Sequence, residues 1–450
     1  MQRFAPAMMF GMVSVAVGSC SEGEPGTVMA PVTSVVCPED GPVSGAEIFT
    51  RNFVVDTALH DIGLGVGVDA TGNTFVAGGF RNTVDLGRGP LVSAGGYDLF
   101  VAKLDPGGET LWSARFGGPE DDRFAALAVD EAGDVWLVGS DEGSGIVVIG
   151  LDPTGNQRLS RTYGGGDYES VNGAAVDREG ALLLVGSYAG EEFDLGLGRL
   201  GVYEGEFLAK IDRAGNTVFA RPIRGSSDNN IADVAAAPDG DIVIGGEMRS
   251  VLRLDGIEGA GAGATDAFAA RFDARGQTRW IRRFGGREFD EGHEVAVDAL
   301  GNTWLTGEFE EIVDLGAGPI VPRDCCESFV VTLDPAGRPL RHRLDVPFQI
   351  EADGAGNVVL AGAFTGTLEG FGDALTSAGG SDAYVVKLGR TGEVRWSRRV
   401  GGAKSENARD LAVNCRGRSA IVGSREDPAA PAPSLSFEGP IEVFVTALAP

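Results

Sequence analysis

Short apolar runs recur along the whole chain, separated by turns that carry Asp, Asn, Gly and Pro. The clearest repeat is an apolar run that ends in an Asp turn and a Gly, followed at once by a second apolar run; residues 68–72 read Val-Asp-Ala-Thr-Gly. Equivalent turn positions are Asp69, Asp130, Asp177, Ala237, Asp298, Asp353 and Asn414. Their successive spacings are 61, 47, 60, 61, 55 and 61 residues. A period of this order is typical of propellers and solenoids.

Each repeat continues with an aromatic-led run, a Pro/Gly turn and another aromatic-led run. Residues 100–104 lead through Asp-Pro-Gly to Leu-Trp-Ser at 111–113, and residues 268–272 and 384–388 begin similar pairs, with a weaker copy at 147–151. β-branched and aromatic runs bounded by such turns predict strands. Every repeat therefore predicts four short strands, and four-stranded units arranged radially form a propeller. We predict an all-β, seven-bladed β-propeller.

The last repeat lacks its fourth strand. Its third strand is predicted at residues 444–448, close to the end of the chain, whereas residues 49–53 near the beginning match the fourth strand at 112–116. We predict that this N-terminal strand completes the last blade, because closure removes two exposed sheet edges. An open solenoid is the alternative architecture, but it would not need its missing strand at the other terminus.

Together these motifs resemble a bacterial repeat family. A Val-Asp-x-x-Gly-Asn core, as at residues 68–73, is followed by an Asp-x-Phe-Val-x-Lys-Leu-Asp strand, as at residues 98–105. Over residues 47–450 the chain is similar to the seven-bladed SBBP repeat proteins, which occur on secreted or surface proteins. The resemblance implies the propeller fold and no catalytic residues. NHL repeats share the core, but their Asn-x-Arg element is not evident here, and the Trp-Asp dipeptide of WD40 blades does not occur.

Charge and composition exclude some partners. Acidic residues outnumber basic ones by 65 to 37, which gives a net charge of −28. Phosphates of nucleic acids and anionic membrane surfaces would repel such a chain. We therefore expect no nucleic-acid partner, and contact with a membrane only through a lipid anchor. The repeat indicates one large domain, residues 46–450, which we expect to be monomeric.

The first residues predict export and lipidation. Residues 1–19 carry one early charge, Arg3, and a short apolar stretch, which is typical of a signal peptide rather than a membrane span. The stretch runs into Val-Gly-Ser-Cys, which resembles a bacterial lipobox with Cys20 as the lipidated residue. Residues 20–45 are rich in Pro and Gly and are predicted to form a flexible tether. Ser21 after the cysteine favours the outer membrane.

The remaining cysteines predict a disulfide. Cys37, Cys325, Cys326 and Cys415 are an even set in an exported chain, and three connectivities are open. Propeller geometry favours Cys37 with Cys415, because both belong to the closing blade and the chain between Cys37 and Phe49 can span the about 14 Å between outer and inner strands. Cys325 and Cys326 would then form a vicinal disulfide or remain thiols. A cysteine zinc site is not expected, since no Cys-x-x-Cys pair occurs.

Carboxylates recur eight residues before the turn positions. The predicted metal-binding residues are Asp61, Asp122, Glu169, Asn229, Asp290, Asp345 and Glu406. Because each would begin an innermost strand, we expect them to ring the mouth of the central channel. Crowded carboxylates repel unless a cation lies among them, and oxygen ligands favour Ca²⁺. The alternative interpretation is an acidic consensus that starts the strand and stays solvated.

Other catalytic signatures are not evident. His60, His293 and His342 are isolated in the sequence, and neither a His-Glu-x-x-His nor a Gly-x-Ser-x-Gly motif occurs. Long loops between the second and third strands suit recognition. We therefore predict a non-enzymatic binding or scaffold protein of the cell envelope whose ligand is a protein or a glycan. The alternative is a Ca²⁺-dependent glycan-active hydrolase or lyase that uses the channel-mouth carboxylates.

Overall fold

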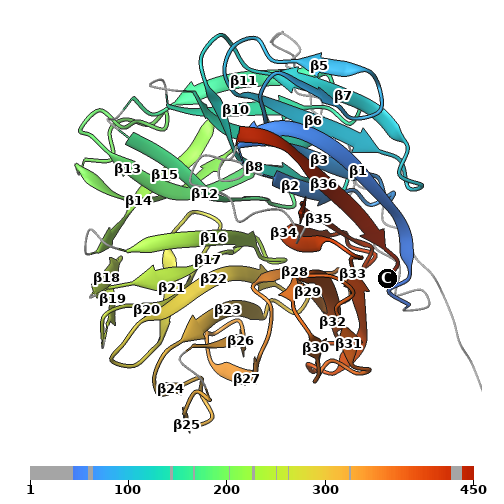
Figure 1. Ribbon diagram of the computed structural model, residues 1–450. Coiled ribbons are helices and arrows are strands. Elements are labelled where there is room, and N and C mark those ends of the chain that lie inside the picture. The colour runs from blue at the N-terminus through green and yellow to red at the C-terminus, as the bar shows by residue number, and fades with distance from the viewer. Residues whose placement is uncertain are drawn as a thin grey trace, which may run out of the picture. The chain divides into compact units, whose positions relative to one another are not determined.

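The chain folds into a ring of seven four-stranded antiparallel sheets, a seven-bladed β-propeller, as predicted (Figure 1). The computed structural model describes residues 44–58, 64–141, 145–165, 168–201, 203–225, 229–249, 251–261, 263–323, 326–426 and 438–450. Within these ranges, no segment forms a helix that is long and apolar enough to cross a bilayer.

Each blade contributes strands A to D from the centre of the ring to its rim. The A strands are β2 (Leu64–Val68), β8 (Asp122–Val129), β12 (Tyr168–Val176), β16 (Asn230–Ala236), β22 (Asp290–Val297), β28 (Gln349–Ala352) and β34 (Ser405–Val413). The B strands are β3 (Thr74–Phe80), β9 (Val135–Asp141), β13 (Leu182–Ala189), β17 (Ile242–Met248), β23 (Thr303–Phe309), β29 (Val358–Phe364) and β35 (Ser419–Glu426). The C strands are β6 (Asp98–Leu104), β10 (Gly145–Leu151), β14 (Glu204–Ile211), β20 (Asp266–Phe272), β26 (Glu327–Leu333), β32 (Asp382–Leu388) and β36 (Glu438–Leu448). The D strands are β7 (Thr110–Phe116), β11 (Gln157–Tyr163), β15 (Thr217–Gly225), β21 (Thr278–Phe284), β27 (Pro339–Leu344), β33 (Val394–Val400) and β1 (Glu47–Ala58).

In the repeated turn between strands A and B, the Asp side chain accepts hydrogen bonds from backbone amides of the same turn. In the first blade, Asp69 Oδ1 accepts hydrogen bonds from the amides of Thr71 and Asn73, both at 2.9 Å. Gly72 adopts φ +85°, a left-handed conformation that favours glycine, and its amide donates to the Asp69 carbonyl at 2.9 Å. The same side-chain and backbone contacts recur around Asp298 and Asp353. The motif that revealed the repeat is therefore a turn that aligns two strands.

The N-terminal strand closes the ring, as predicted. β1 pairs antiparallel with β36 from Glu47 opposite Leu448 to Ala58 opposite Glu438. Beyond this pairing, the amide of Ser44 donates to the carbonyl of Pro450 at 2.6 Å. The last blade thus takes three strands from the end of the chain and one from its beginning, which are the blue and red strands that lie side by side in Figure 1.

Four of the long B–C loops carry small hairpins at the rim. They are β4–β5 (Thr83–Asp85, Pro90–Val92), β18–β19 (Val251–Leu254, Ile257–Ala260), β24–β25 (Val313–Asp314, Pro319–Ile320) and β30–β31 (Thr367–Leu368, Leu375–Thr376). The first extends the closing blade beyond β1, and the second extends the third blade beyond β15. Buried apolar residues such as Val84 and Leu86 join the core beneath them. Two of these loops therefore cover a sheet edge, a use that the sequence analysis did not foresee.

An arginine in strand D links several pairs of neighbouring blades. The side chain donates to a carbonyl oxygen in the C–D turn of the next blade, as Arg51 Nε does to Gly108 at 2.8 Å and Arg282 Nε to Gly337 at 2.6 Å. The aromatic residue two positions earlier packs on the same glycine. A Cβ on Gly337, whose φ is +75°, would lie 2.7 Å from Trp280, so the turn needs glycine for both its conformation and its contact.

The closing strand can be tested by a pair of adjacent substitutions. Phe53 is 9% exposed and packs in the core between the last and first blades, whereas the neighbouring Val54 is 60% exposed. We expect Phe53→Ala to lower the free energy of unfolding by about 3–5 kcal/mol through loss of burial and cavity formation. The control Val54→Ala should change it by less than about 1 kcal/mol. Equal effects in chemical denaturation would contradict the assigned strand.

Candidate functional site

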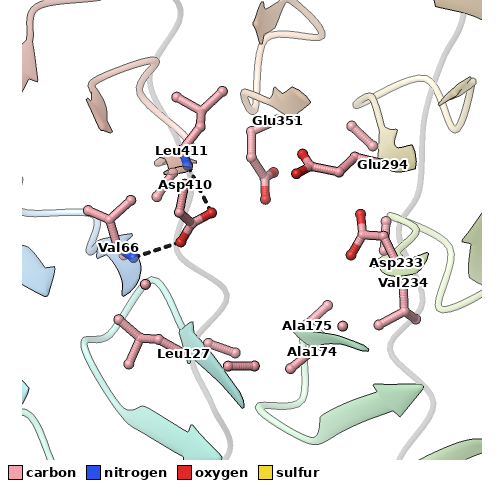
Figure 2. A pocket seen from close by; sticks show the side chains of 18 of the residues that line it. Val66, Leu127, Ala174, Ala175, Asp233, Val234, Glu294, Glu351, Asp410 and Leu411 are labelled. Carbon is pink, nitrogen blue, oxygen red and sulfur yellow. Dashed lines mark hydrogen bonds between the residues drawn. The ribbon is translucent and has the colours of Figure 1, made fainter. Parts of the chain in front are cut away.

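The A strands surround a cavity of about 420 Å³ at the centre of the ring. Every blade contributes to the wall. The inner strands are short and lie around one axis, so any long side chain on their inner face enters this space (Figure 2). The cavity is therefore the place where residues from all seven repeats come together.

Charge is distributed unevenly around this cavity. The strands of blades four to seven each place one carboxylate in it, and Figure 2 shows these side chains projecting inward; they are Asp233, Glu294, Glu351 and Asp410. The strands of the first three blades contribute mainly glycine, alanine and other apolar residues at the wall; among them are Gly65, Gly67, Ala126, Ala128, Gly173, Ala174 and Ala175. One side of the channel is thus mainly acidic, although Arg409 of the seventh blade also lines it, and the other is mostly small and apolar apart from Asn172.

The small residues are required by close packing between neighbouring A strands. A Cβ on Gly65 would lie 2.7 Å from the ring of Phe124 and 2.8 Å from Cβ of Leu127. A Cβ on Gly67 would lie 2.4 Å from Val129. Side chains from the second blade therefore fill the space that larger residues on β2 would need.

Three of the four carboxylates also link adjacent blades. Each accepts a hydrogen bond from a backbone amide on the A strand of the next blade: Asp233 from Val295 at 3.0 Å, Glu294 from Ile350 at 2.9 Å and Asp410 from Val66 at 2.7 Å. The last of these joins the seventh blade to the first (Figure 2). The channel carboxylates therefore have a structural role, and the other oxygen of Asp410 accepts a hydrogen bond from the amide of Leu411 at 2.8 Å.

Confinement raises the pKa of all four carboxyl groups. Burial raises the pKa of Asp233, and burial together with repulsion from Asp233 raises the pKa of Glu294 well above its usual range. Burial, with added repulsion from Asp233, raises the pKa of Asp410 to about 7. The Glu351 side chain is exposed to the channel. Its pKa is nevertheless raised to about 8, mainly because the surrounding strands exclude much of the solvent and also because Asp233 and Asp410 repel its charge. The acidic side of the channel therefore changes its charge near neutral pH.

Five of the residues predicted to ring the channel mouth lie at or next to the beginning of their A strands, where several secure their own loops, whereas Asp345 precedes Gln349, the first residue of β28. Three accept a hydrogen bond from the second glycine of the preceding Gly-Gly pair: Asp122 from Gly118 at 2.8 Å, Asp290 from Gly286 at 2.6 Å and Glu406 from Gly402 at 3.1 Å. Burial and repulsion from Asp266 raise the pKa of Asp290 to about 6. These contacts explain why an acidic residue recurs at this position without requiring a cation.

The other predicted ring residues differ from one another. Asn229 accepts a hydrogen bond from the amide of Arg249 at 3.0 Å, and Asp345 forms an ion pair with Arg323. Glu169 lies beside Gly164, whose Cβ would come within 2.9 Å of it. Asp61 is outside the described residues. Binding of Ca²⁺ by this ring stays a prediction.

A different group has the composition of a metal-binding cluster. Among the described residues, Glu291, His293 and Glu308 place one ligand atom each within 4.8 Å of one another, and all three are half-buried. Burial lowers the pKa of His293, which favours the neutral imidazole, whereas burial and then repulsion from Glu291 raise the pKa of Glu308. Sequence reasoning missed this cluster because its histidine was treated as isolated.

The structure describes only some of the cysteines that the predicted disulfides involve. Cys415 lies in the turn between β34 and β35, where its amide donates to Glu131 Oε1 at 2.8 Å. Cys20, Cys37 and Cys325 are outside the described residues, and Cys326 is an exposed residue at the start of a described range. The pairing of Cys37 with Cys415 stays a prediction.

Comparison with known proteins yields distant likenesses. No protein-family model matches the chain. A 228-residue stretch, 49% of the chain, is 23% identical to the regulatory protein FlaEY of Caulobacter vibrioides. This stretch covers 18% of FlaEY, so the chain spans less than a fifth of that relative.

Solved structures with similar backbones share little sequence with this chain. Hydrazine synthase of Kuenenia stuttgartiensis is 12% identical, with a TM-score of 0.44 over 79% of this chain and 91% of its own. The Dos1 propeller is 10% identical, with a TM-score of 0.43 over 89% and 94%. YCF48 bound to a D1 peptide is 12% identical, with a TM-score of 0.42 over 88% and 99%. These likenesses assign no ligand and no activity to this chain.

The raised pKa of Glu351 predicts a pH-dependent stability. Between its usual pKa of 4.5 and the folded value of about 8, the folded protein binds this proton more tightly than the unfolded chain does, so the free energy of unfolding falls as pH rises. Asp233, Glu294 and Asp410, whose pKa values are also raised, add to the effect.

We expect Glu351→Gln to be more stable than the wild type at pH 8.5 and equally stable near pH 4.5. The gain should be about 1 kcal/mol, because channel water screens much of the charge. The exposed Glu369→Gln serves as control. Thermal unfolding across this pH range measures the difference, and a gain that is independent of pH would contradict the assignment.

Proposed function

We propose that this protein is a non-enzymatic binding scaffold that receives a positively charged segment of a partner protein in the acidic half of its central channel. The observation that carries the proposal is the gathering of Asp233, Glu294, Glu351 and Asp410 in one cavity opposite a wall of small residues. The cavity volume of about 420 Å³ is within the range of about 300–1,000 Å³ typical of ligand sites.

Electrostatics favours a cationic occupant. The carboxylates repel one another, and an opposite charge nearby favours their ionised form and lowers their pKa. The whole chain has a net charge of −28, so its field attracts basic partners from a distance. The apolar wall formed by the first three blades suits the aliphatic stem of a lysine or arginine side chain.

The proposed place of action is the cell envelope. The signal-peptide pattern of residues 1–19, the lipobox-like Cys20 and the tether at residues 20–45 support a propeller that is anchored by lipid, in the outer membrane. The resemblance to SBBP repeats supports the same location. Residues 1–43 are outside the described ranges, so the proposal depends on the sequence pattern.

A second candidate is a glycan-active enzyme that uses carboxylates of the central cavity in place of the predicted channel-mouth residues. It is favoured by the pKa values of Asp410 and Glu351, which are about 7 and about 8 and therefore suited to proton transfer near neutral pH. Turnover of a polysaccharide that is lost in Glu351→Gln and retained in Glu369→Gln would support this function in place of the scaffold.

The binding proposal predicts that basic peptides bind and that channel carboxylates are needed. The probe is a labelled hexa-arginine peptide, with hexa-glutamate as the negative probe. We expect Glu294→Gln/Glu351→Gln to weaken binding of hexa-arginine about tenfold or more, as for loss of a charge-assisted hydrogen bond worth about 1.5–3 kcal/mol. Fluorescence anisotropy at physiological salt measures the affinity.

A matched control separates the channel from the general field of the protein. Glu120→Gln/Glu369→Gln removes the same two charges from exposed positions outside the cavity. This variant should lose less than about twofold in affinity, because exposed charges are screened over about 8 Å at physiological salt. Equal losses in the two double variants would show that binding follows net charge and not the channel.

The envelope proposal has its own test. Cys20→Ala should move the protein from the membrane fraction to the soluble fraction of cells, because the lipid is the predicted anchor. Non-reducing peptide mapping of the same material should recover a peptide that links Cys37 to Cys415. Unchanged membrane association, or a Cys37–Cys325 peptide, would contradict the respective prediction.

A further inference from the structure

The fifth blade contains a cluster of mixed metal-ligating side chains apart from the channel carboxylates. One ligand atom each from Glu291, His293 and Glu308 lies within 4.8 Å of the other two. Ligands that share an ion at about 2.1 Å are at most about 4.2 Å apart. Side-chain movements of less than about 1 Å would therefore bring all three onto one ion.

Pairing between β22 and β23 fixes the positions of the two carboxylates. Glu291 and Glu308 are direct partners across the antiparallel strands, so their side chains emerge on the same face. Like charges in direct cross-strand positions destabilise a sheet. A structural role for this pair would therefore need a compensating positive charge.

An irregularity in β22 brings the histidine to the same place. The register shifts between Gly292 and Val295, which inserts His293 into a bulge. Thr306 holds this bulge, because its hydroxyl accepts from the amide of Glu294 at 3.1 Å and donates to the carbonyl of Phe348 at 2.7 Å. Bulges are frequent next to functional sites because they redirect a side chain.

A close backbone contact makes the arrangement rigid. A Cβ on Gly292 would lie 2.3 Å from the carbonyl oxygen of Gly246 in β17, so only glycine allows the two strands to meet. This contact fixes the residues on either side, Glu291 and His293. Ligands held on paired strands and not on a free loop are already close to a binding geometry.

His293 supplies an independent sign of a missing ligand. Its Nε2 is buried and, within the described structure, has no hydrogen-bond partner, although the ring packs on Phe348 with 4.2 Å between centroids. A buried polar atom without a partner is unfavourable, and such atoms in native proteins commonly have an unseen ion or water. This atom belongs to the residue that completes the carboxylate pair.

The surroundings add negative charge. Glu247 of β17 interacts with Glu291, and Glu310 interacts with Glu308. Arg249 is the cation that acts on Glu247. A divalent cation at the centre would relieve repulsion among these groups, which a water molecule could not do.

We propose that Glu291, His293 and Glu308 form a binding site for a divalent first-row transition-metal ion of the Zn²⁺ type. The imidazole decides the class, because nitrogen ligands suit Zn²⁺ and its neighbours, whereas Ca²⁺ and Mg²⁺ prefer oxygen ligands alone. Three protein ligands leave a fourth position open for water or a partner's side chain. This site is separate from the predicted Ca²⁺ ring and does not depend on the proposed channel function.

Calorimetric titration of the metal-free protein with ZnCl₂, MnCl₂ and CaCl₂ tests the site. We expect one Zn²⁺ per chain, bound more tightly than Ca²⁺. His293→Ala and Glu308→Gln should each weaken Zn²⁺ binding by about 10–100-fold or more. Loss of a residue that only supports a metal ligand already weakens metal binding by that factor. The matched controls His342→Ala, in strand D of the same blade, and Glu369→Gln should bind as the wild type does.

A second measurement keeps the proposal open to refutation if a ligand variant does not fold. The chain has three histidines, so its imidazole NMR signals are few. The His293 signal is the one that is still present in the spectra of both metal-free variants, His60→Ala and His342→Ala. We expect substoichiometric Mn²⁺ to broaden this signal before the other two. Equal Zn²⁺ affinity of folded His293→Ala and wild type, or broadening of the His60 or His342 signal first, would overturn the site.

Discussion

Closure of the ring by β1 is the constraint on which the rest of this structure depends. A propeller blade buries its two faces against its neighbours, so the first and last blades would each expose a face if the ring were open. β1 prevents this by pairing with β36, while Phe49, Phe53 and Val55 enter the core shared with the first blade. The hydrogen bond from the amide of Val66 to Asp410 then joins the inner strands across the same seam.

The closed ring gives the channel carboxylates two functions that compete. Asp233, Glu294 and Asp410 bind backbone amides of the next blade, which fixes their geometry and favours the ionised form. Confinement favours the neutral form and raises their pKa values. Each of these carboxyl groups thus links two blades and also changes its protonation with pH. Replacing one of them alters both the contact between the blades and the electrostatic potential in the cavity.

The sequence allowed the fold to be predicted because turn chemistry and strand pattern are local. Phe49 and Phe53 were recognisable as a strand of the missing type, and the pairing of β1 is as expected. The position of Asp233 was not predictable, because a register shift just before it changes the face on which it lies. The meeting of His293 and Glu308 also depends on a bulge and a cross-strand pairing that leave no periodic trace in the sequence.

The position of β1 between β36 and the β4–β5 hairpin has a mechanical consequence. β1 is antiparallel to β36 over nearly its whole length, so tension applied along its axis from Ser44 loads the ladder of hydrogen bonds in shear, and the bonds resist together instead of opening one by one. The strand that completes the ring is also the one next to the predicted tether. A pull on the chain that precedes Ser44 would therefore act on many of these hydrogen bonds at once.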